Sequence, residues 1–223
     1  SIFLVTAIFS VADMMIRTQS DRMTGKNGSW HIELDGISQE TALKIAERDD
    51  VVSIGAVTIF NPDGELPYRM DGKRVVLYGI DESYLTMNST GAAEGRFPQG
   101  MGEIMLSSNA ARVLQVAVGD TVTLRTPSGD WDFTVSGLGG VEESYYSGQY
   151  SLMDAYLPRT AFAALMEQNN VHNLQTSYYV QFTSASKAAK AIPELTAQHN
   201  LPENAVSENT GVMAIAGHSD SSA

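Results

Sequence analysis

The stretch that decides the fold is residues 95–139, GRFPQGMGEIMLSSNAARVLQVAVGDTVTLRTPSGDWDFTVSGLG. Its first part is rich in glycine, and the apolar segment 103–106 then predicts a short strand. Ser107 is typical of a helix N-cap, because a serine oxygen can accept a hydrogen bond from the free amides of a first helical turn. A short helix is therefore expected over 108–114.

The second half of this stretch predicts a β-hairpin. Residues 121–126 (TVTLRT) and 131–136 (WDFTVS) alternate between apolar and polar side chains, as half-buried strands do. Pro127, Ser128, Gly129 and Asp130 between them are turn residues. A Gly119-Asp120 turn connects the helix to the hairpin, so this block forms one compact strand, helix and hairpin.

Working outward, strands and helices alternate on both sides of this block. Residues 29–34 predict a strand with Trp30, Ile32 and Leu34 on one face and with His31 beside Glu33 on the polar face. Ser38 predicts the cap of a helix whose Leu43, Ile45 and Ala46 share one side. The other expected elements are strands over 51–60, 73–80, 155–158 and 176–183, a helix over 159–168, and a helix over 186–199 that Pro193 interrupts.

The order of these elements favours an α+β fold of two lobes. Residues 23–85 and 151–210 form a mixed βαβ lobe, and residues 86–150 form a β-rich lobe inserted into it. Residues 81–102 are expected to be mostly loop, because they contain four glycines and a proline.

The first 22 residues differ from the rest of the chain. Residues 2–16 (IFLVTAIFSVADMMI) are almost entirely apolar, and the chain becomes polar at Arg17. This run is shorter than the about 20 residues that a membrane-spanning helix needs, and it lacks the basic start of a secretory signal. Residues 1–22 are therefore interpreted as the outer end of a transmembrane helix that continues as a stalk helix.

Composition excludes several functions. The chain has 14 basic and 26 acidic residues, a net charge of −12, which argues against a nucleic-acid surface. It contains no cysteine, so disulfides, a cysteine nucleophile and thiolate metal sites are excluded. The four histidines are scattered without metal-binding spacing, and no cofactor or metal is expected.

No catalytic motif stands out either. Ser107-Ser108 follows a strand but lacks the GxSxG pattern of a nucleophile elbow, and a helix cap explains it better. The carboxylate pairs Asp49-Asp50 and Glu142-Glu143 are interpreted as solvated. The chain is therefore predicted not to be an enzyme. Tyrosine combines apolar area with a polar tip, so the loop residues Tyr145, Tyr146 and Tyr150 are the candidate contact residues.

In this order, the segments resemble the extracytoplasmic domain of ABC transporter permeases of the FtsX-like/MacB family, the MacB-like periplasmic core domain. The resemblance is strongest over residues 95–139, and the residues that carry it are Gly95-Arg96, Gly102-Glu103, Ser107, Ala111, Leu114, Gly119-Asp120 and Val135-Ser136-Gly137. Tyr156-Leu157-Pro158, followed by a helix with Phe162, and the apolar start are also similar.

This resemblance implies a location on the extracytoplasmic face of the cell membrane. It implies that residues 211–223 lead into the next membrane helix and that an ABC ATPase subunit acts through membrane helices outside this chain. The domain would couple ATP-driven motion to substrate export, extraction or partner binding. A second permease copy or an extracytoplasmic protein would be a further partner.

Two hypotheses from other classes remain open at this point. A ligand-binding sensor domain of a membrane receptor would have one dominant apolar pocket with convergent polar groups. An extracytoplasmic hydrolase would need a convergent Ser, His and Asp set. The permease hypothesis predicts that residues 1–20 and 208–223 emerge on the same side of the fold.

Overall fold

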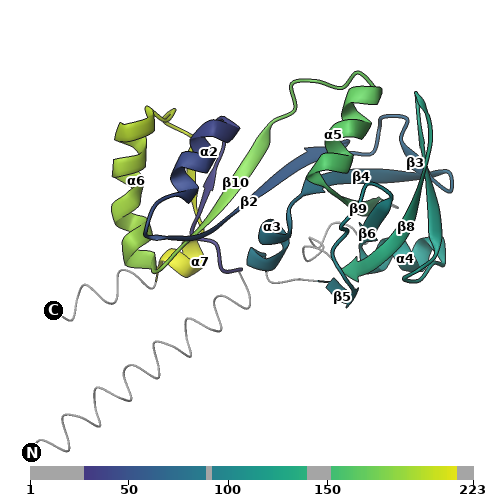
Figure 1. Cartoon of the computed structure of the whole chain (residues 1–223), viewed down its shortest axis with the longest axis horizontal. Coiled ribbons are helices and arrows are strands. Elements are labelled where there is room, and N and C mark those ends of the chain that lie inside the picture. Colours follow the sequence, from purple (N-terminus) through teal and green to yellow (C-terminus); the bar gives the residue numbers. More distant parts are fainter. Residues whose placement is uncertain (1–27, 89–91, 140–151, 215–223) are drawn as a thin grey trace, which may run out of the picture. The chain divides into compact units, whose positions relative to one another are not determined.

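The computed structural model of the chain describes residues 28–88, 92–139 and 152–214 (Figure 1). These residues form two compact units, each with helices and strands. Unit 1 consists of residues 28–54, 87–88 and 179–214, and unit 2 consists of residues 55–86, 92–139 and 152–178. The α+β class with two lobes is thus confirmed, whereas the expected stalk helix lies outside the described residues.

Unit 1 is built from two strand–helix–strand segments that are far apart in the sequence. Its elements are β1 (Ile32–Leu34), α2 (Gln39–Ala46), the first part of β2 (Val51–Phe60), the last part of β10 (Thr176–Phe182), α6 (Ala185–His199), β11 (Val206–Glu208) and α7 (Thr210–Met213). The strand order is β11-β1-β10-β2. The two segments therefore interleave, as in ferredoxin-like split βαβ folds.

The helices of unit 1 bury one side against these strands. Figure 1 shows α2 and α6 beside them. On α2, which Ser38 caps as predicted, the buried residues are Ala42 and Ile45. The prediction that Leu43 lies on the buried face was wrong, because Leu43 is 58% exposed. Ala42 and Ile45 are three residues apart and share the buried side of the helix, and Leu43 is not on that side.

The predicted interruption of α6 at Pro193 was also wrong, because the helix continues through this residue. A proline removes the hydrogen bond to the carbonyl four residues earlier, here that of Ala189. Both Pro193 and Ala189 are exposed, so water can satisfy this carbonyl. The buried residues of α6 are Ala188, Ala191 and Leu195.

Unit 2 is organised around a closed ring of strands. Its further elements are β3 (Arg69–Met70), β4 (Lys73–Ile80), α3 (Glu82–Met87, apart from its last residue), β5 (Ala92–Gly95), β6 (Glu103–Leu106), α4 (Ser108–Leu114), β7 (Thr121–Thr126), β8 (Gly129–Gly139), β9 (Met153–Pro158) and α5 (Arg159–Gln168). Pairing runs β4-β3-β7-β8-β6-β9 and returns from β9 to β4, while β5 pairs with β8.

The main core of unit 2 is formed by alternating residues of these strands together with α4 and α5. Leu77, Phe133 and Leu157 are buried in it, and Phe162 of α5 packs directly on β4. A Cβ at Gly79 would overlap the ring of Phe162, so the absence of a side chain there allows the helix to approach the strand.

Two features of unit 2 differ from the sequence expectation. β4 and β9, which were expected in the mixed lobe, pair with each other in parallel over six residue pairs, and β9 also pairs with β6. This pairing places both strands in the ring, so the units have other bounds than the expected lobes. The expected loop 81–102 contains the helix α3. Asp81 caps the first turn of this helix, because its side chain accepts a hydrogen bond from the Tyr84 amide at 2.8 Å.

Candidate functional site

Residues 95–139, which carry the family resemblance, form a close-packed junction between β5 and β8. Gly95 pairs with Gly137, and Gly95 has φ +72°, a conformation that favours glycine. A Cβ on Gly95 would overlap the carbonyl oxygen of Ser136, and one on Gly137 would overlap that of Arg96. The two glycines are therefore required because two backbones meet here.

An ion pair holds the next part of this junction together. The Arg96 guanidinium binds the Glu103 carboxylate through both of its terminal nitrogens, and the Gln99 amide donates to the same carboxylate at 2.7 Å. These bonds, first that of Arg96, lower the pKa of Glu103 to about 2. Arg96 and Glu103 thus close the glycine-rich loop 96–103 on itself.

The remaining residues of the resemblance also have structural roles. Ser107 caps α4 by accepting from the Ala110 amide at 3.0 Å, as predicted. Asp120 accepts from the Ala117 amide at 2.8 Å, which fixes the Gly119-Asp120 turn. The Ser136 hydroxyl donates toward the carbonyls of Arg96 and Ile104. The junction is therefore a structural framework, and nothing in it indicates a reaction.

A second constellation joins the first and last described segments of the chain. β1 and β11 pair antiparallel, with Ile32 opposite Glu208. Asn209 donates from its side-chain amide to the Trp30 carbonyl and from its backbone to the His31 carbonyl, both at 2.9 Å. We call residues 28–32 together with 208–213 the terminal seam.

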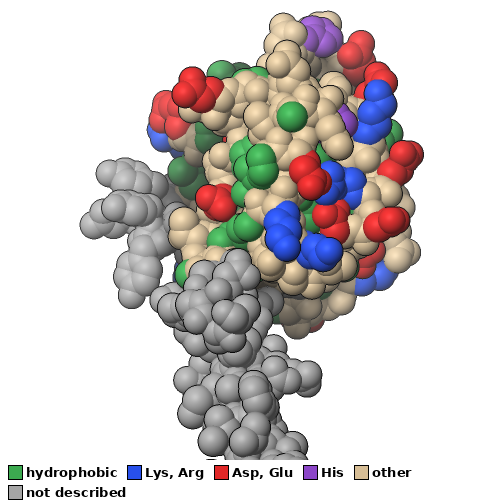
Figure 2. All heavy atoms as spheres, turned by 90° about the vertical axis from the view of Figure 1, so that its left-hand side faces the viewer, with side chains coloured by type: hydrophobic (Ala, Val, Ile, Leu, Met, Phe, Trp, Pro, Cys, Tyr) green, Lys and Arg blue, Asp and Glu red, His purple; other side chains and the backbone are tan. Residues whose placement is uncertain are grey.

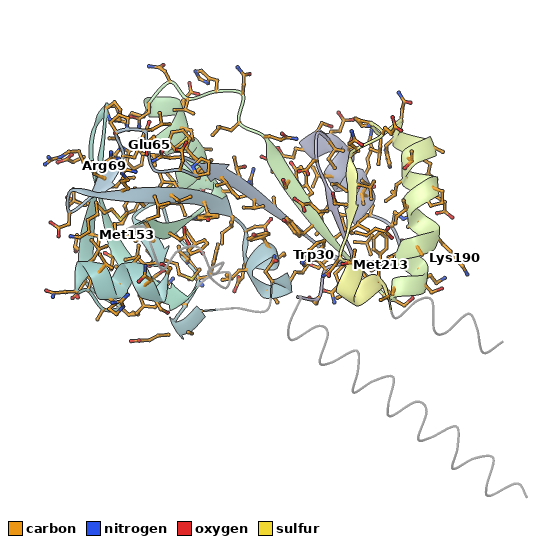
Figure 3. All side chains as sticks on the ribbon, turned by 180° about the vertical axis from the view of Figure 1, so that it is seen from behind. Trp30, Glu65, Arg69, Met153, Lys190 and Met213 are labelled. Atoms are coloured by element: carbon orange, nitrogen blue, oxygen red, sulfur yellow. The ribbon has the colours of Figure 1, made fainter. Side chains whose placement is uncertain are left out.

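The terminal seam places both described ends of the chain at the same end of the β1–β11 pair. In an antiparallel pair, the start of one strand lies beside the end of the other. Gly28 precedes β1, and α7 follows β11, where the Met213 amide donates to the Asn209 carbonyl at 2.8 Å. Figure 3 shows the labelled Trp30 and Met213 close together at this end of unit 1.

His31 lies inside this seam, so its predicted place on a polar strand face was wrong. The residue is 7% exposed, and its Nδ1 accepts a bond from the Phe182 amide at 2.9 Å. Burial lowers the pKa of His31 below its ordinary value. Its ring also meets the ring of Phe182 edge to face at 6.1 Å.

The other candidate residues are distributed as follows. Tyr145, Tyr146, Tyr150 and the Glu142-Glu143 pair lie outside the described residues. Asp50 of the pair Asp49-Asp50 is not simply solvated, because Arg48 binds both of its carboxylate oxygens at 2.8 Å and also binds Glu194. Among the described residues, no group of three His, Asp or Glu side chains could hold a metal ion.

Charges on the helical face of unit 1 are mixed in sign. Figure 2 shows Lys and Arg side chains interspersed with Asp and Glu side chains. Two ion pairs here are Lys44 with Glu40, 2.9 Å, and Arg48 with Glu194, 2.8 Å. Over residues 28–88, 92–139 and 152–214, no helix has the length and apolar character needed to cross a bilayer.

Sequence reasoning missed Asn209 and the role of His31. Asn209 lies 179 residues from Trp30 in the sequence, and an isolated asparagine carries no local signal of such a contact. The alternation of strands and helices on both sides of the central block was the indication in the sequence that the two segments belong to one unit.

Comparison with known proteins gives a consistent result. The family model of the MacB-like periplasmic core domain matches residues 1–198. The fold is similar to the periplasmic region of MacB from Actinobacillus actinomycetemcomitans (14% identity, TM-score 0.58, 85% of this chain and 94% of that chain). It is also similar to the extracellular domain of the noncanonic ABC-type transporter YknZ from Gram-positive bacteria (15% identity, TM-score 0.54, 80% and 98%).

No curated protein matches the sequence. The two structures are too distant in sequence to show more than the fold, so the family assignment depends on the match over residues 1–198. The chain therefore belongs to the MacB-like periplasmic core domain family, the extracytoplasmic domains of MacB/FtsX-like ABC transporter permeases.

Proposed function

We propose that this domain couples ATP-driven motion of membrane helices to events on the extracytoplasmic face, and that it does so mechanically, without catalysing a reaction. The motion would come from an ABC ATPase subunit through the permease's membrane helices. The terminal seam would receive it, and unit 2 would present it to a substrate, a second permease copy or an extracytoplasmic protein.

The observation that carries this proposal is the geometry of the terminal seam in a chain of this family. Glu208 and Ile32 are opposite each other, and the bonds from Asn209 to Trp30 and His31 tie the two strands together just beyond that pair. Because these hydrogen bonds connect the two segments directly, a displacement of one segment would also move the other. The framework of residues 95–139 supports a lever role, because interlocked backbones resist deformation.

The experiment uses the full permease reconstituted with its ATPase in nanodiscs. Hydrogen exchange of the seam peptides 28–34 and 206–213 is measured without nucleotide and with ATP and vanadate. We expect protection of these peptides to change with nucleotide state. A flexible six-residue Gly/Ser insertion immediately before Gly28 should abolish that change, because a slack connection transmits no displacement.

The matched control places the same insertion between Asp71 and Gly72, in the exposed turn between β3 and β4, where a Cβ on Gly72 would meet nothing within 4 Å. This variant should retain the nucleotide response. Equal exchange of the seam in both nucleotide states, in a complex that hydrolyses ATP when vanadate is absent, would contradict the proposal. An exchange response to a small ligand with no nucleotide present would instead favour the sensor hypothesis.

We also propose that the loop with Tyr145, Tyr146 and Tyr150 contacts the extracytoplasmic partner. The loop connects β8 to β9, and in the ring of unit 2 these two strands are separated by β6. Replacing all three tyrosines by serine should weaken partner binding at least about tenfold, since buried tyrosines dominate many interfaces. The nucleotide response of the seam should remain. Unchanged partner affinity of the triple variant would refute this assignment.

A further inference from the structure

His31 supplies an unusual bond between β1 and β10. Its backbone N–H donates to the Val180 carbonyl at 2.8 Å, and its carbonyl accepts from Asn209 on the other side. The next donor on β10, the Phe182 amide, is satisfied by the imidazole Nδ1 at 2.9 Å. One side chain thus completes the connection between β10 and the terminal seam.

This bond requires a neutral ring. Nδ1 can accept a hydrogen bond only when the proton of the imidazole is on Nε2, and the protonated ring carries N–H groups at both nitrogens. After protonation, an N–H at Nδ1 would oppose the N–H of Phe182. The bond would be lost, and a buried amide would be left without an acceptor unless the strands separate.

In the described part of the chain, no carboxylate forms an ion pair with the His31 ring. The titratable side chains on the adjoining strands are Glu33 on β1, Tyr178 and Tyr179 on β10 and Glu208 on β11, and α7 has none. The charged side chains of α2 and α6 are exposed, and α6 ends with the half-buried His199. Arg48, which follows α2, is paired with Asp50 and Glu194. Burial is the cause of the lowered pKa of His31, with no charged neighbour contributing.

We propose that the bond from the Phe182 amide to His31 is an acid-release latch of the terminal seam. In a mildly acidic medium outside the cell, the ring takes up a proton, the bond opens and β1 loosens from β10. The latch rests on the proposed function, because it regulates the seam that would transmit motion. Acid would weaken the coupling of this domain to the membrane helices.

The direction follows from proton linkage. When β1 separates from β10, His31 regains its ordinary pKa of about 6.5, whereas the closed seam holds it lower. The open state therefore binds more protons, and the closed seam is fully favoured above about pH 6.5 and loses stability as the pH falls below it.

The test measures protection of the Phe182 amide against hydrogen exchange in the 223-residue chain, corrected for intrinsic exchange chemistry. We expect protection to fall at least about fivefold between pH 7.5 and 5.0. His31→Asn keeps an acceptor at the position of Nδ1 but does not titrate, so its protection should stay within about twofold. His172→Asn, at an exposed histidine of unit 2, should behave like the wild type.

Two results would overturn the latch. One is equal acid loss of protection in the His31→Asn chain. The other, which needs no variant, is an NMR titration in which His31 of the wild type takes up its proton at or above the ordinary histidine pKa.

Failure of the latch is distinguishable from failure of the proposed function. In the reconstituted permease, the nucleotide response of the seam is measured at pH 7.5 and at pH 5.0, in the wild type and in His31→Asn. If the response at pH 7.5 is retained unchanged at pH 5.0 in both proteins, only the latch is rejected. Absence of a nucleotide response at both pH values rejects the coupling function, whereas the latch is still decided by the Phe182 amide.

Discussion

The framework of residues 95–139 in unit 2 and the terminal seam of unit 1 are held together in opposite ways. In the framework, all partners lie within one continuous segment: Arg96 binds Glu103 seven residues later, and Ser136 binds the Arg96 carbonyl across 40 residues. In the seam, Asn209 binds Trp30 and Phe182 binds His31, across 179 and 151 residues.

This difference shows why only one of the two regions resembles a motif. Partners within one continuous segment leave a fixed spacing in the sequence, so the glycines, the serine cap and the Gly-Asp turn can be recognised together. Long-range partners leave no spacing, and the seam is recognisable only in three dimensions. The framework is expected to depend on backbone sterics, and the seam on individual hydrogen bonds.

The strongest test of this contrast is Gly137→Ala in the framework. The new Cβ would overlap the Arg96 carbonyl oxygen, a backbone atom that cannot move aside. We expect the free energy of unfolding to fall by about 2–4 kcal/mol. Chemical denaturation followed by circular dichroism measures it. Gly100→Ala, where a Cβ meets nothing within 4 Å, should change stability by less than about 0.5 kcal/mol.

Asn209→Ala probes the seam at a single hydrogen bond. The substitution leaves the Trp30 carbonyl without its 2.9 Å donor, which should lower the free energy of unfolding by about 1–2 kcal/mol. The same denaturation experiment measures it, with Asn204→Ala, at an exposed position of unit 1, as control. A loss as large as that of Gly137→Ala would show that the seam is as sterically constrained as the framework.

A smaller effect is expected for Ser107→Ala, which removes the N-cap of α4. Loss of a capping oxygen costs about 1 kcal/mol, measurable as a lower melting temperature. Ser38→Ala does the same to α2 of unit 1, and the two losses should agree within about 0.5 kcal/mol if caps act locally in both units. Ser107 is 3% exposed, whereas Ser38 is exposed. A clearly larger loss of stability for Ser107→Ala would show that burial of the serine adds to the stabilisation by the cap.

The smallest effect should come from Glu103→Gln. The ion pair with Arg96 is partly exposed, so its loss at pH 7 should cost less than about 1 kcal/mol. The pKa of Glu103 is about 2 in the folded chain against an ordinary 4.5. The folded state therefore holds this proton less readily, and the stabilisation present above about pH 4.5 is lost as the pH falls toward 2.

Acid titration of stability measures this effect of Glu103. Glu103→Gln should flatten the loss between pH 4.5 and 2, and Glu94→Gln, at an exposed residue of the neighbouring β5, should leave it unchanged. A wild-type slope retained in Glu103→Gln would mean that other carboxylates dominate acid unfolding.

Much of the fold could be predicted from the sequence because its signals are local. Strand β4, helices α4 and α5, the Ser38 and Ser107 caps and the two-lobe α+β class all follow from alternation, capping and turn residues. The predicted face of α2 was wrong at Leu43 and the predicted interruption of α6 was wrong at Pro193, because packing and solvent access decided both.

The sequence by itself determined the elements of this protein and, through the spacing of Gly95, Arg96, Glu103 and Ser107, the framework by which the family is recognised. Only the tertiary structure decided that β4 and β9 close the ring of unit 2 and that Asn209 and His31 join the first and last described segments. The physical reason is that helix caps, turns and alternation are set by neighbouring residues. Strand pairing and buried polar contacts are set by which distant segments can satisfy each other's hydrogen bonds once water is excluded.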